Sequence, residues 1–283
     1  MRTRLISAAV LVPVVVILFW LGRPWISLAV ALLAILVAWE TTRLVRAAGL
    51  PANGWLVAVP VLLLIARFEL TNSNVTFFYG APAQVVQFAV VAWATVAALD
   101  GLRQKDPRQG FLAWAGTLLA GAYVSLLAFV VGVLTFHVGD ESGQGVRWLL
   151  LLVLTVWTLD SAAYVVGRYF PRGHFMNHIS PKKTWSGAIG GTAAAIVVCT
   201  ALVVAFGQAV NPAVGVLLGV VIAASAQAGD LAESMIKRAA GAKDSGTLIP
   251  GHGGFLDRVD SFMFAAPTMY VTLLLVFASL GVE

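Results

Sequence analysis

The sequence predicts an all-α, polytopic bundle of transmembrane helices, and three observations support this fold class. Of the 283 residues, 60% belong to the hydrophobic set and 11% are charged, and the mean hydropathy is +0.90. This composition is far more apolar than that of a soluble globular protein. Apolar runs long enough to cross a bilayer recur along the chain, and the short segments between them hold nearly all charged residues. The period-two alternation of a transmembrane β-barrel is absent from the sequence.

Nine apolar segments are predicted to span the membrane as helices. The first follows Met1-Arg2-Thr3-Arg4 and is interpreted as an uncleaved span, because no small-residue cleavage site follows it. The fifth is long enough to be one tilted span or two short spans broken near Gly121. The predicted spans are 5–22, 25–42, 54–68, 84–99, 111–136, 148–167, 187–207, 212–229 and 262–281.

The basic residues predict how these spans are oriented. With the N-terminus in the cytoplasm, every Lys and Arg except Arg23, Arg67 and Arg147 lies in a cytoplasmic segment, as the positive-inside rule expects. Two spans within 111–136 would move the bases between Arg168 and Lys183 outside, so the rule favours nine spans and an outside C-terminus. The basic residues behind the net charge of +5 then lie along the cytoplasmic surface of the membrane. There they suit anionic lipid headgroups or phosphorylated substrates rather than nucleic acid.

The domain prediction is a single integral membrane domain over 1–283. Its N-terminal spans occupy 1–136, and its C-terminal, catalytic spans occupy 148–283 with cytoplasmic loops at 168–186 and 229–261. The single cysteine, Cys199, lies within an apolar run, so we interpret it as a buried hydrophobic residue.

Charged residues of both signs concentrate in the loop at 229–261. A connector between two spans has no need of four aspartates, so this density indicates a bound polyvalent ligand. If the preceding span continues as a helix, Asp230 and Lys237 share one face with either Glu233 or Ser234 between them. The glycines between 241 and 254, among them Gly253 and Gly254, would let backbone N–H groups approach a phosphate closely. His252, between two glycines, is either a turn residue or a phosphate contact.

The aspartates of this loop are the predicted metal ligands. Asp257 and Asp260 lie three residues apart at the start of the last span, and Asp230 follows a strongly apolar span. Hard oxygen ligands without a cysteine or histidine cluster favour Mg²⁺, and two-metal phosphoryl chemistry also fits. For Asp260 the alternative is a helix cap.

A second polar cluster is predicted between 160 and 185. Asp160, Tyr164 and Arg168 are spaced by four and share one stripe of the sixth span, where a structural ion pair is the alternative to a substrate contact. Lys182 and Lys183 are either topogenic charges or phosphate ligands. The next helix begins with glycines that favour close helix packing, at positions 187, 190 and 191.

Residues 234–261, SMIKRAAGAKDSGTLIPGHGGFLDRVDS, resemble the signature of the phosphatidate cytidylyltransferases, also called CDP-diacylglycerol synthases. Two upstream segments, DSAAYVVGRYF and SPKKTW, also resemble family segments and occur in the expected order. One departure is visible, because Ser186 stands where the family usually has Glu. We expect that position to have a supporting role.

The resemblance implies a nucleotidyltransferase that uses CTP and phosphatidic acid, together with Mg²⁺ and an optional second metal or K⁺. It implies a multi-pass protein of the bacterial inner membrane, with the active site facing the cytoplasm, surrounded by membrane lipid and forming a homodimer. The expected catalytic residues are Asp230, Lys237, Asp257, Arg258 and Asp260, with metal bound by Asp230, Asp257 and Asp260. The expected substrate-binding residues are Asp160, Tyr164, Arg168, Lys182, Lys183, Arg238, Lys243, Asp244, His252, Gly253 and Gly254.

Three other functions compete with this prediction. A CTP-dependent lipid kinase or a phospho-sugar transferase acting on a polyprenyl phosphate would also need aspartates and Mg²⁺. An ion-coupled transporter would use Asp160 and Asp230 to bind a cation at membrane depth.

Overall fold

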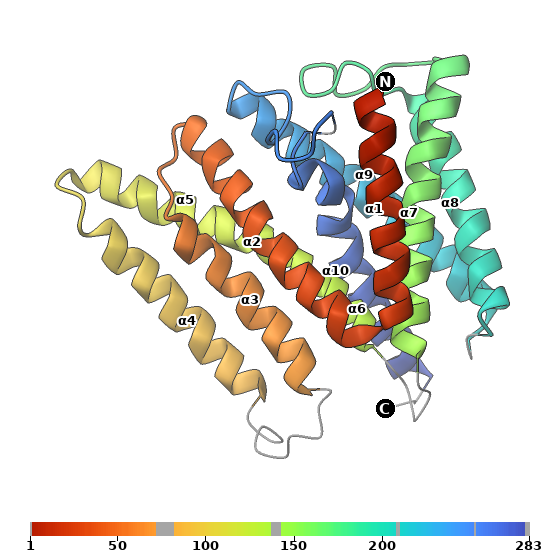
Figure 1. The fold of residues 1–283 in the computed structure, drawn as a ribbon, viewed down its shortest axis with the longest axis horizontal. Helices are drawn as coiled ribbons and strands as arrows, with labels where there is room; N and C mark the ends of the chain where they lie inside the picture. Colours follow the sequence, from red (N-terminus) through yellow and green to blue (C-terminus); the bar gives the residue numbers. More distant parts are fainter. Residues whose placement is uncertain (1, 72–81, 137–142, 208–209, 252, 281–283) are drawn as a thin grey trace. The chain divides into compact units, whose positions relative to one another are not determined.

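The computed structural model describes residues 2–71, 82–136, 143–207, 210–251 and 253–280, and within these ranges it contains helices and no β-strand (Figure 1). The chain divides into two compact units. Unit 1 comprises Met1–Thr135 and Ile236–Val259, and unit 2 comprises Phe136–Met235 and Asp260–Glu283. The all-helical prediction is therefore confirmed for the part of the chain that is described.

Unit 1 is built around helix α3 (Gly54–Thr71), which packs against α2 (Arg23–Ala47), α4 (Pro82–Gly101) and α5 (Pro107–Ser125). Helix α1 (Arg2–Leu21) contacts α2. At one place α3 and α2 are also joined by an ion pair, because Arg23 donates to the carboxylate of Glu69 at 2.9 Å. Figure 1 shows α2, α3 and α4 side by side in this unit.

The fifth predicted span has no break near Gly121. Helix α5 continues to Ser125, and a 3₁₀ turn at Leu126–Ala128 joins it to α6 (Phe129–Thr135). A Cβ atom at Gly121 would lie 2.5 Å from the ring of Trp93, so this glycine serves close packing of α5 against α4.

Unit 2 contains α7 (Gln144–Tyr169), α8 (Trp185–Ala205) and most of α9 (Pro212–Ala239) and α10 (Leu256–Ser279). The predicted glycine packing is confirmed here. A Cβ at Gly187 would lie 2.8 Å from the carbonyl oxygen of Ala163, and one at Gly191 would lie 2.8 Å from that of Leu159. Helices α7 and α8 therefore approach at backbone distance, which larger residues at these positions would prevent.

Six of the described helices are long and apolar enough to cross a membrane: α2, the run Pro107–Thr135, α7, α8, α9 and α10. Large apolar side chains such as Trp20, Phe88 and Val197 are more than 60% exposed, which suits a protein whose solvent is lipid. Two other apolar stretches, Val12–Leu21 and Phe88–Gly101, are shorter. The protein is thus polytopic, while the count of nine spans and the orientation of the termini stay predictions.

About half of the polar loop expected at 229–261 is helical. Helix α9 continues to Ala239 and α10 begins at Leu256, so only 240–255 lies outside helices. The prediction that Asp230, Ser234 and Lys237 belong to one continuing helix is confirmed, and Asp257 and Asp260 lie in the first turns of α10.

Substituting Gly191→Leu should destabilise unit 2, because the new side chain would collide with the α7 backbone. Overpacking of this kind costs about 1–3 kcal/mol or more. Ala193→Leu is the matched control, since Ala193 lies two residues away on the exposed face of α8. Thermal unfolding of both purified variants in detergent measures the effect. Equal melting temperatures for the two variants would contradict the close contact of α7 and α8.

Candidate functional site

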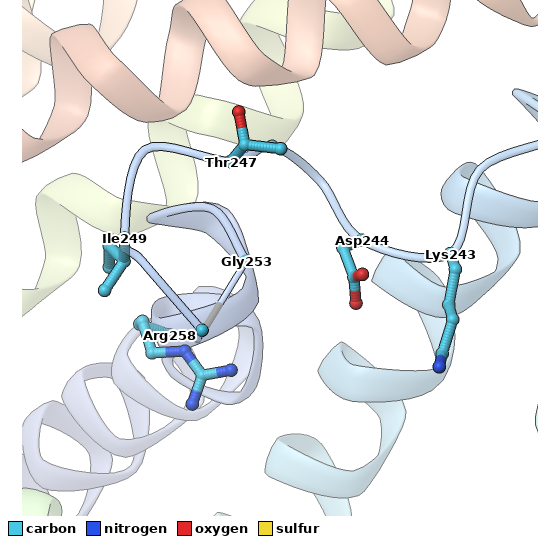
Figure 2. A pocket seen from close by; sticks show the side chains of 8 residues that line it. Lys243, Asp244, Thr247, Ile249, Gly253 and Arg258 are labelled. Carbon is cyan, nitrogen blue, oxygen red and sulfur yellow. The ribbon is translucent and has the colours of Figure 1, made fainter. Parts of the chain in front are cut away.

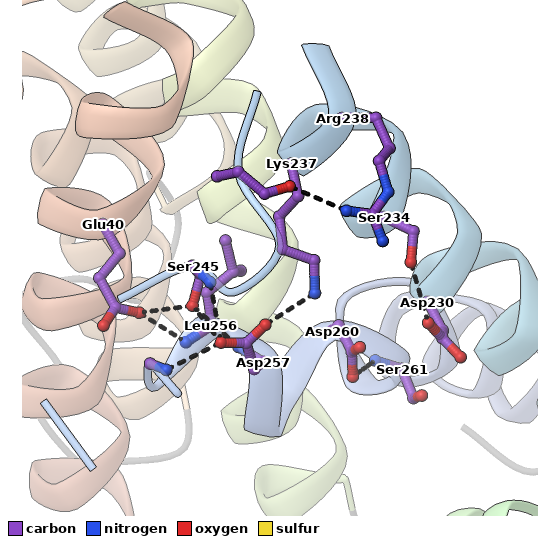
Figure 3. Close-up of polar contacts among 12 residues, drawn as sticks. Glu40, Asp230, Ser234, Lys237, Arg238, Ser245, Leu256, Asp257, Asp260 and Ser261 are labelled. Atoms are coloured by element: carbon purple, nitrogen blue, oxygen red, sulfur yellow. Dashed lines mark hydrogen bonds and ion pairs between the residues drawn. The ribbon is translucent and has the colours of Figure 1, made fainter. Parts of the chain in front are cut away.

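A buried ion pair of unit 1 joins the end of α9 to the start of α10. Lys237 Nζ donates to Asp257 Oδ1 at 2.7 Å, and the two side chains are 11% and 7% exposed (Figure 3). Burial removes water from both groups, so each depends on the other to offset its desolvation. The pair therefore fixes where α10 begins relative to the last turn of α9.

The second oxygen of Asp257 organises the loop between these helices. Its Oδ2 accepts hydrogen bonds from Ser245 N at 2.9 Å, Ser245 Oγ at 2.7 Å and Gly254 N at 2.8 Å. Gly253 is at φ +80°, and a Cβ there would lie 2.5 Å from Oδ2, so glycine is required. Both ends of the loop, near 245 and 254, are thus tied to one carboxylate.

A second carboxylate, from α2, reaches the same loop. Glu40 is fully buried, and its Oε2 accepts from Leu256 N at 2.8 Å and from Ser245 Oγ at 3.3 Å (Figure 3). The N–H of Leu256 belongs to the first turn of α10, where helical N–H groups have no partner within the helix. Glu40 therefore caps α10 from a different helix.

The loop encloses a pocket of about 580 Å³, lined by residues of 243–258. Figure 2 shows the side chains of Lys243, Asp244 and Arg258 on the inner side of the loop, whereas Thr247 points the other way. Lys243 and Arg258 are exposed at the surface of this pocket, so both cations are available to a ligand. Two cations and a glycine-rich backbone form a site of the size and charge that suits phosphate groups.

Two other residues predicted for this loop behave differently. Arg238 is exposed and donates to the carbonyl oxygen of Ala242 at 3.0 Å, which closes the turn after α9. Gly254 is buried, and a Cβ there would collide with Glu40 and with Ser245 Oγ, so its role is packing around these groups. His252 lies outside the described residues.

Unit 2 has its own polar cluster, centred on Asp230 of α9. Lys183 Nζ lies 2.8 Å from Asp230 Oδ2, and Ser234 Oγ lies 3.5 Å from Oδ1. Gly229 allows α9 to approach α10 closely, since a Cβ there would lie 2.6 Å from the carbonyl oxygen of Asp260. Asp230 and Asp260 are therefore carried by neighbouring turns of two tightly packed helices.

The predicted stripe on α7 is present and faces outward. Asp160, Tyr164 and Arg168 are all exposed, and Arg168 Nη1 donates to Tyr164 Oη at 2.6 Å. The Arg168 guanidinium also lies over the Tyr164 ring, 5.9 Å from its centroid. Asp160 is thus an exposed residue of α7, and its role as a substrate contact or as part of a structural ion pair stays a prediction.

Side-chain contacts also hold the segment before α8. Thr184 caps α8 by accepting from Gly187 N at 3.1 Å, and Phe175 stacks on Trp185 with ring centroids 4.7 Å apart. Ser186, the departure from the family pattern, accepts from Arg172 N at 3.1 Å. Lys182 is exposed, whereas Lys183 is turned inward toward Asp230.

The aspartates fit a hard divalent cation to different degrees. Asp230 is 36% exposed, and a serine hydroxyl lies beside it, which are ligands that Mg²⁺ accepts together with water and phosphate. Both oxygens of Asp257 already accept hydrogen bonds, so a cation there would displace a donor. Within the described residues, no three His, Cys, Asp or Glu side chains converge. Mg²⁺ usually needs only one or two carboxylates plus substrate phosphates, so Asp230 with Asp260 suffices as a protein contribution.

Sequence reasoning missed Glu40 and Ser245. Glu40 ends an apolar run of α2, and the rule that marks a carboxylate beside an apolar span as functional applies to it as it does to Asp230. Ser245 carries no comparable signal, because its role depends on two carboxylates that are distant in the sequence.

Comparison with known proteins places the chain among enzymes. The family model described as "Cytidylyltransferase family" matches residues 2–276. A phosphatidate cytidylyltransferase of Brucella suis is 36% identical over 279 residues, covering 96% of this chain and 92% of the relative. The phosphatidate cytidylyltransferase of Haemophilus influenzae is 33% identical, with 94% and 96% covered, and that of Staphylococcus epidermidis is 33% identical, with 76% and 87% covered.

Breaking the buried pair from one side should cost more stability than removing both charges. Asp257→Asn removes the carboxylate at 2.7 Å from the Lys237 ammonium, and breaking a buried ion pair from one side costs about 3–5 kcal/mol. The double variant Lys237→Met with Asp257→Asn removes that charge and should recover part of the loss. Melting temperatures in detergent test this order. A double variant as unstable as Asp257→Asn alone would show that the pair is not the source of the effect.

Proposed function

The chain belongs to the cytidylyltransferase family, and on that premise we propose that it transfers the cytidylyl group of CTP to phosphatidate, forming CDP-diacylglycerol and pyrophosphate. The observation that carries this proposal is the loop pocket with Lys243 and Arg258, which suits phosphate groups and lies within the segment bearing the family signature. The likeness extends over nearly the whole chain, so the activity is proposed for the whole protein.

The reaction exchanges one phosphoanhydride bond for another. An oxygen of the phosphatidate phosphate forms a bond to the α-phosphorus of CTP, and the bond from that phosphorus to the oxygen bridging the β-phosphate breaks. The attacking phosphate is already an anion, so no strong general base is required. Catalysis then depends on holding the two phosphates in line and on neutralising their charge.

We assign the triphosphate of CTP to the loop pocket of unit 1. Lys243 and Arg258 supply the charge there, and the backbone around Gly253 allows close approach. Arg238 at the turn before the loop adds a third exposed cation, and Asp244 on the pocket wall suits a hydroxyl or a hydrated cation. The N–H groups and cations of the loop would stabilise charge on the departing pyrophosphate.

The two lysine–aspartate pairs are the groups that substrate binding would rearrange. Lys183 pairs with Asp230 and Lys237 pairs with Asp257, at 2.8 and 2.7 Å. A phosphate group attracts the ammonium and a divalent cation attracts the carboxylate, so ligand binding can separate each pair without leaving either charge uncompensated. Each pair thus keeps its two charges balanced before the ligands arrive.

Mg²⁺, when bound, would neutralise the triphosphate and orient it. We propose Asp230 and Asp260 as its main protein ligands and Asp257 as a ligand once Lys237 has moved to a phosphate; a second metal or K⁺ is a further part of this proposal. Ser234 stands beside Asp230 as an additional oxygen ligand.

The lipid substrate requires cations near the membrane surface. Lys182 and Arg168 are exposed, and Tyr164 holds the Arg168 guanidinium in place. We propose that these two bases guide the phosphatidate headgroup. Asp160, which lies on the same stripe of α7 as Tyr164 and Arg168, would keep that surface polar. The location that we propose is the bacterial inner membrane, with nine spans, a cytoplasmic active site and a homodimeric assembly.

The products formed by the purified protein separate this function from its competitors. Purified protein given CTP, phosphatidate and Mg²⁺ should release pyrophosphate and CDP-diacylglycerol in equal amounts. Release of CDP with phosphorylated lipid would identify a kinase, and activity only with a nucleotide sugar would identify a phospho-sugar transferase. Cation uptake without nucleotide turnover would identify a transporter.

The metal assignment is tested by the magnesium dependence of Asp230→Asn. The variant should need at least about 10-fold more Mg²⁺ for half-maximal rate. Replacing even a residue that only supports a metal ligand weakens metal binding by about 10-fold or more. EDTA should abolish turnover by the wild-type protein. Asp106→Asn is the control, because Asp106 only caps α5 by accepting from Arg108 N. An unchanged magnesium requirement in Asp230→Asn would rule out that aspartate as a ligand.

A further inference from the structure

We infer that Glu40 of α2 is a positioning residue for cytidylyl transfer, because it sets the shape of the loop pocket and thereby affects the binding of CTP. This inference rests on the proposed assignment of the triphosphate to that pocket. Glu40 accepts from Ser245 and Leu256, so its action on the pocket would be indirect, through these two residues.

The contacts of Glu40 reach both ends of the loop. Its Oε2 accepts from Leu256 N at the start of α10 and lies 3.3 Å from Ser245 Oγ. The Ser245 hydroxyl has one proton, and its contact with Asp257 Oδ2 is shorter, at 2.7 Å. Ser245 therefore lies between two carboxylates, and a change at Glu40 alters the hydrogen bonding of Asp257.

The loop backbone is folded closely around the Glu40 carboxylate. A Cβ at Gly246 would lie 2.5 Å from Glu40 Oε1, and a Cβ at Gly254 would collide with both carboxylate oxygens. These two glycines lie next to each other, since a Cβ at Gly246 would be 3.5 Å from Gly254 Cα, and Gly246 itself lines the pocket. The Glu40 carboxylate thus occupies the space around which the loop closes.

Stability alone does not explain a carboxylate at this position. Glu40 has no exposed surface, and Oε1 has no hydrogen-bond donor among the residues that the structure describes. A buried carboxylate with an unsatisfied oxygen is costly, so an apolar residue would suit a membrane helix better. What Glu40 supplies in return is an acceptor for the first turn of α10, next to Asp257 and Arg258.

The test compares Glu40→Leu with Glu40→Gln in steady-state kinetics with CTP and phosphatidate. Glu40→Leu removes the acceptor, and kcat/KM for CTP should fall about 10²-fold through a rise in KM for CTP, the scale of a small misplacement in a catalytic site. KM for phosphatidate should stay near the wild-type value. Glu40→Gln keeps a carbonyl oxygen for Leu256 N–H and should recover most of the loss. A general loss of folded protein would lower the rate with both substrates and would not change the KM for CTP alone.

Glu69→Gln is the matched control, since Glu69 is also a glutamate of unit 1 and accepts from Arg23 and Ser27. It should leave both KM values unchanged. If Glu40→Leu does not fold, Ser245→Ala provides the second test, because it removes the hydroxyl between Glu40 and Asp257 and should selectively weaken CTP binding.

The outcomes separate this inference from the function on which it rests. Active wild-type protein together with wild-type KM for CTP in the Glu40 and Ser245 variants would overturn the positioning role. Equal losses toward CTP and phosphatidate would overturn it as well. A wild-type protein that forms no pyrophosphate from the two substrates would overturn the proposed function itself.

Discussion

The carboxylate of Asp257 is the interaction on which the polar segment of this protein depends. Four hydrogen bonds, from Lys237, Gly254 and both donors of Ser245, converge on its two oxygens. In a largely apolar protein, a stretch of non-helical backbone must find partners for its N–H groups, because lipid and packed helices offer none. One carboxylate at the first turn of α10 provides several of them and fixes the loop between 240 and 255.

The way in which the loop is held also determines which cations are free to bind a ligand. The loop is held by hydrogen bonds to Asp257 and Glu40, which leaves Lys243 and Arg258 exposed around the pocket. Cations that are not used to hold the fold can bind a ligand, whereas Lys237 is already committed to Asp257. Lys237 supports the fold, whereas Lys243 and Arg258 face the pocket and give the proposed triphosphate site its positive charge.

The N-terminal half of the chain also contributes to this arrangement. The signature that resembles the cytidylyltransferases lies near the C-terminus, yet residues 236–259 form one compact unit with the helices before Phe136. Glu40 is the point where α2 makes hydrogen bonds to that segment. An N-terminal helix that appears in the sequence only as an apolar span thus supports the polar loop directly.

The sequence by itself determined the helical membrane fold, the helical continuation through Asp230 and Lys237, the glycine packing of α8 and the concentration of charge near the C-terminus. These features follow from composition and from local periodicity, which depend on neighbouring residues alone. Only the tertiary structure decided that Lys183 pairs with Asp230, that Asp160 faces outward and that Glu40 and Ser245 meet Asp257. Such pairings depend on which faces of distant helices come together, and helical spacing defines a face without naming its partner.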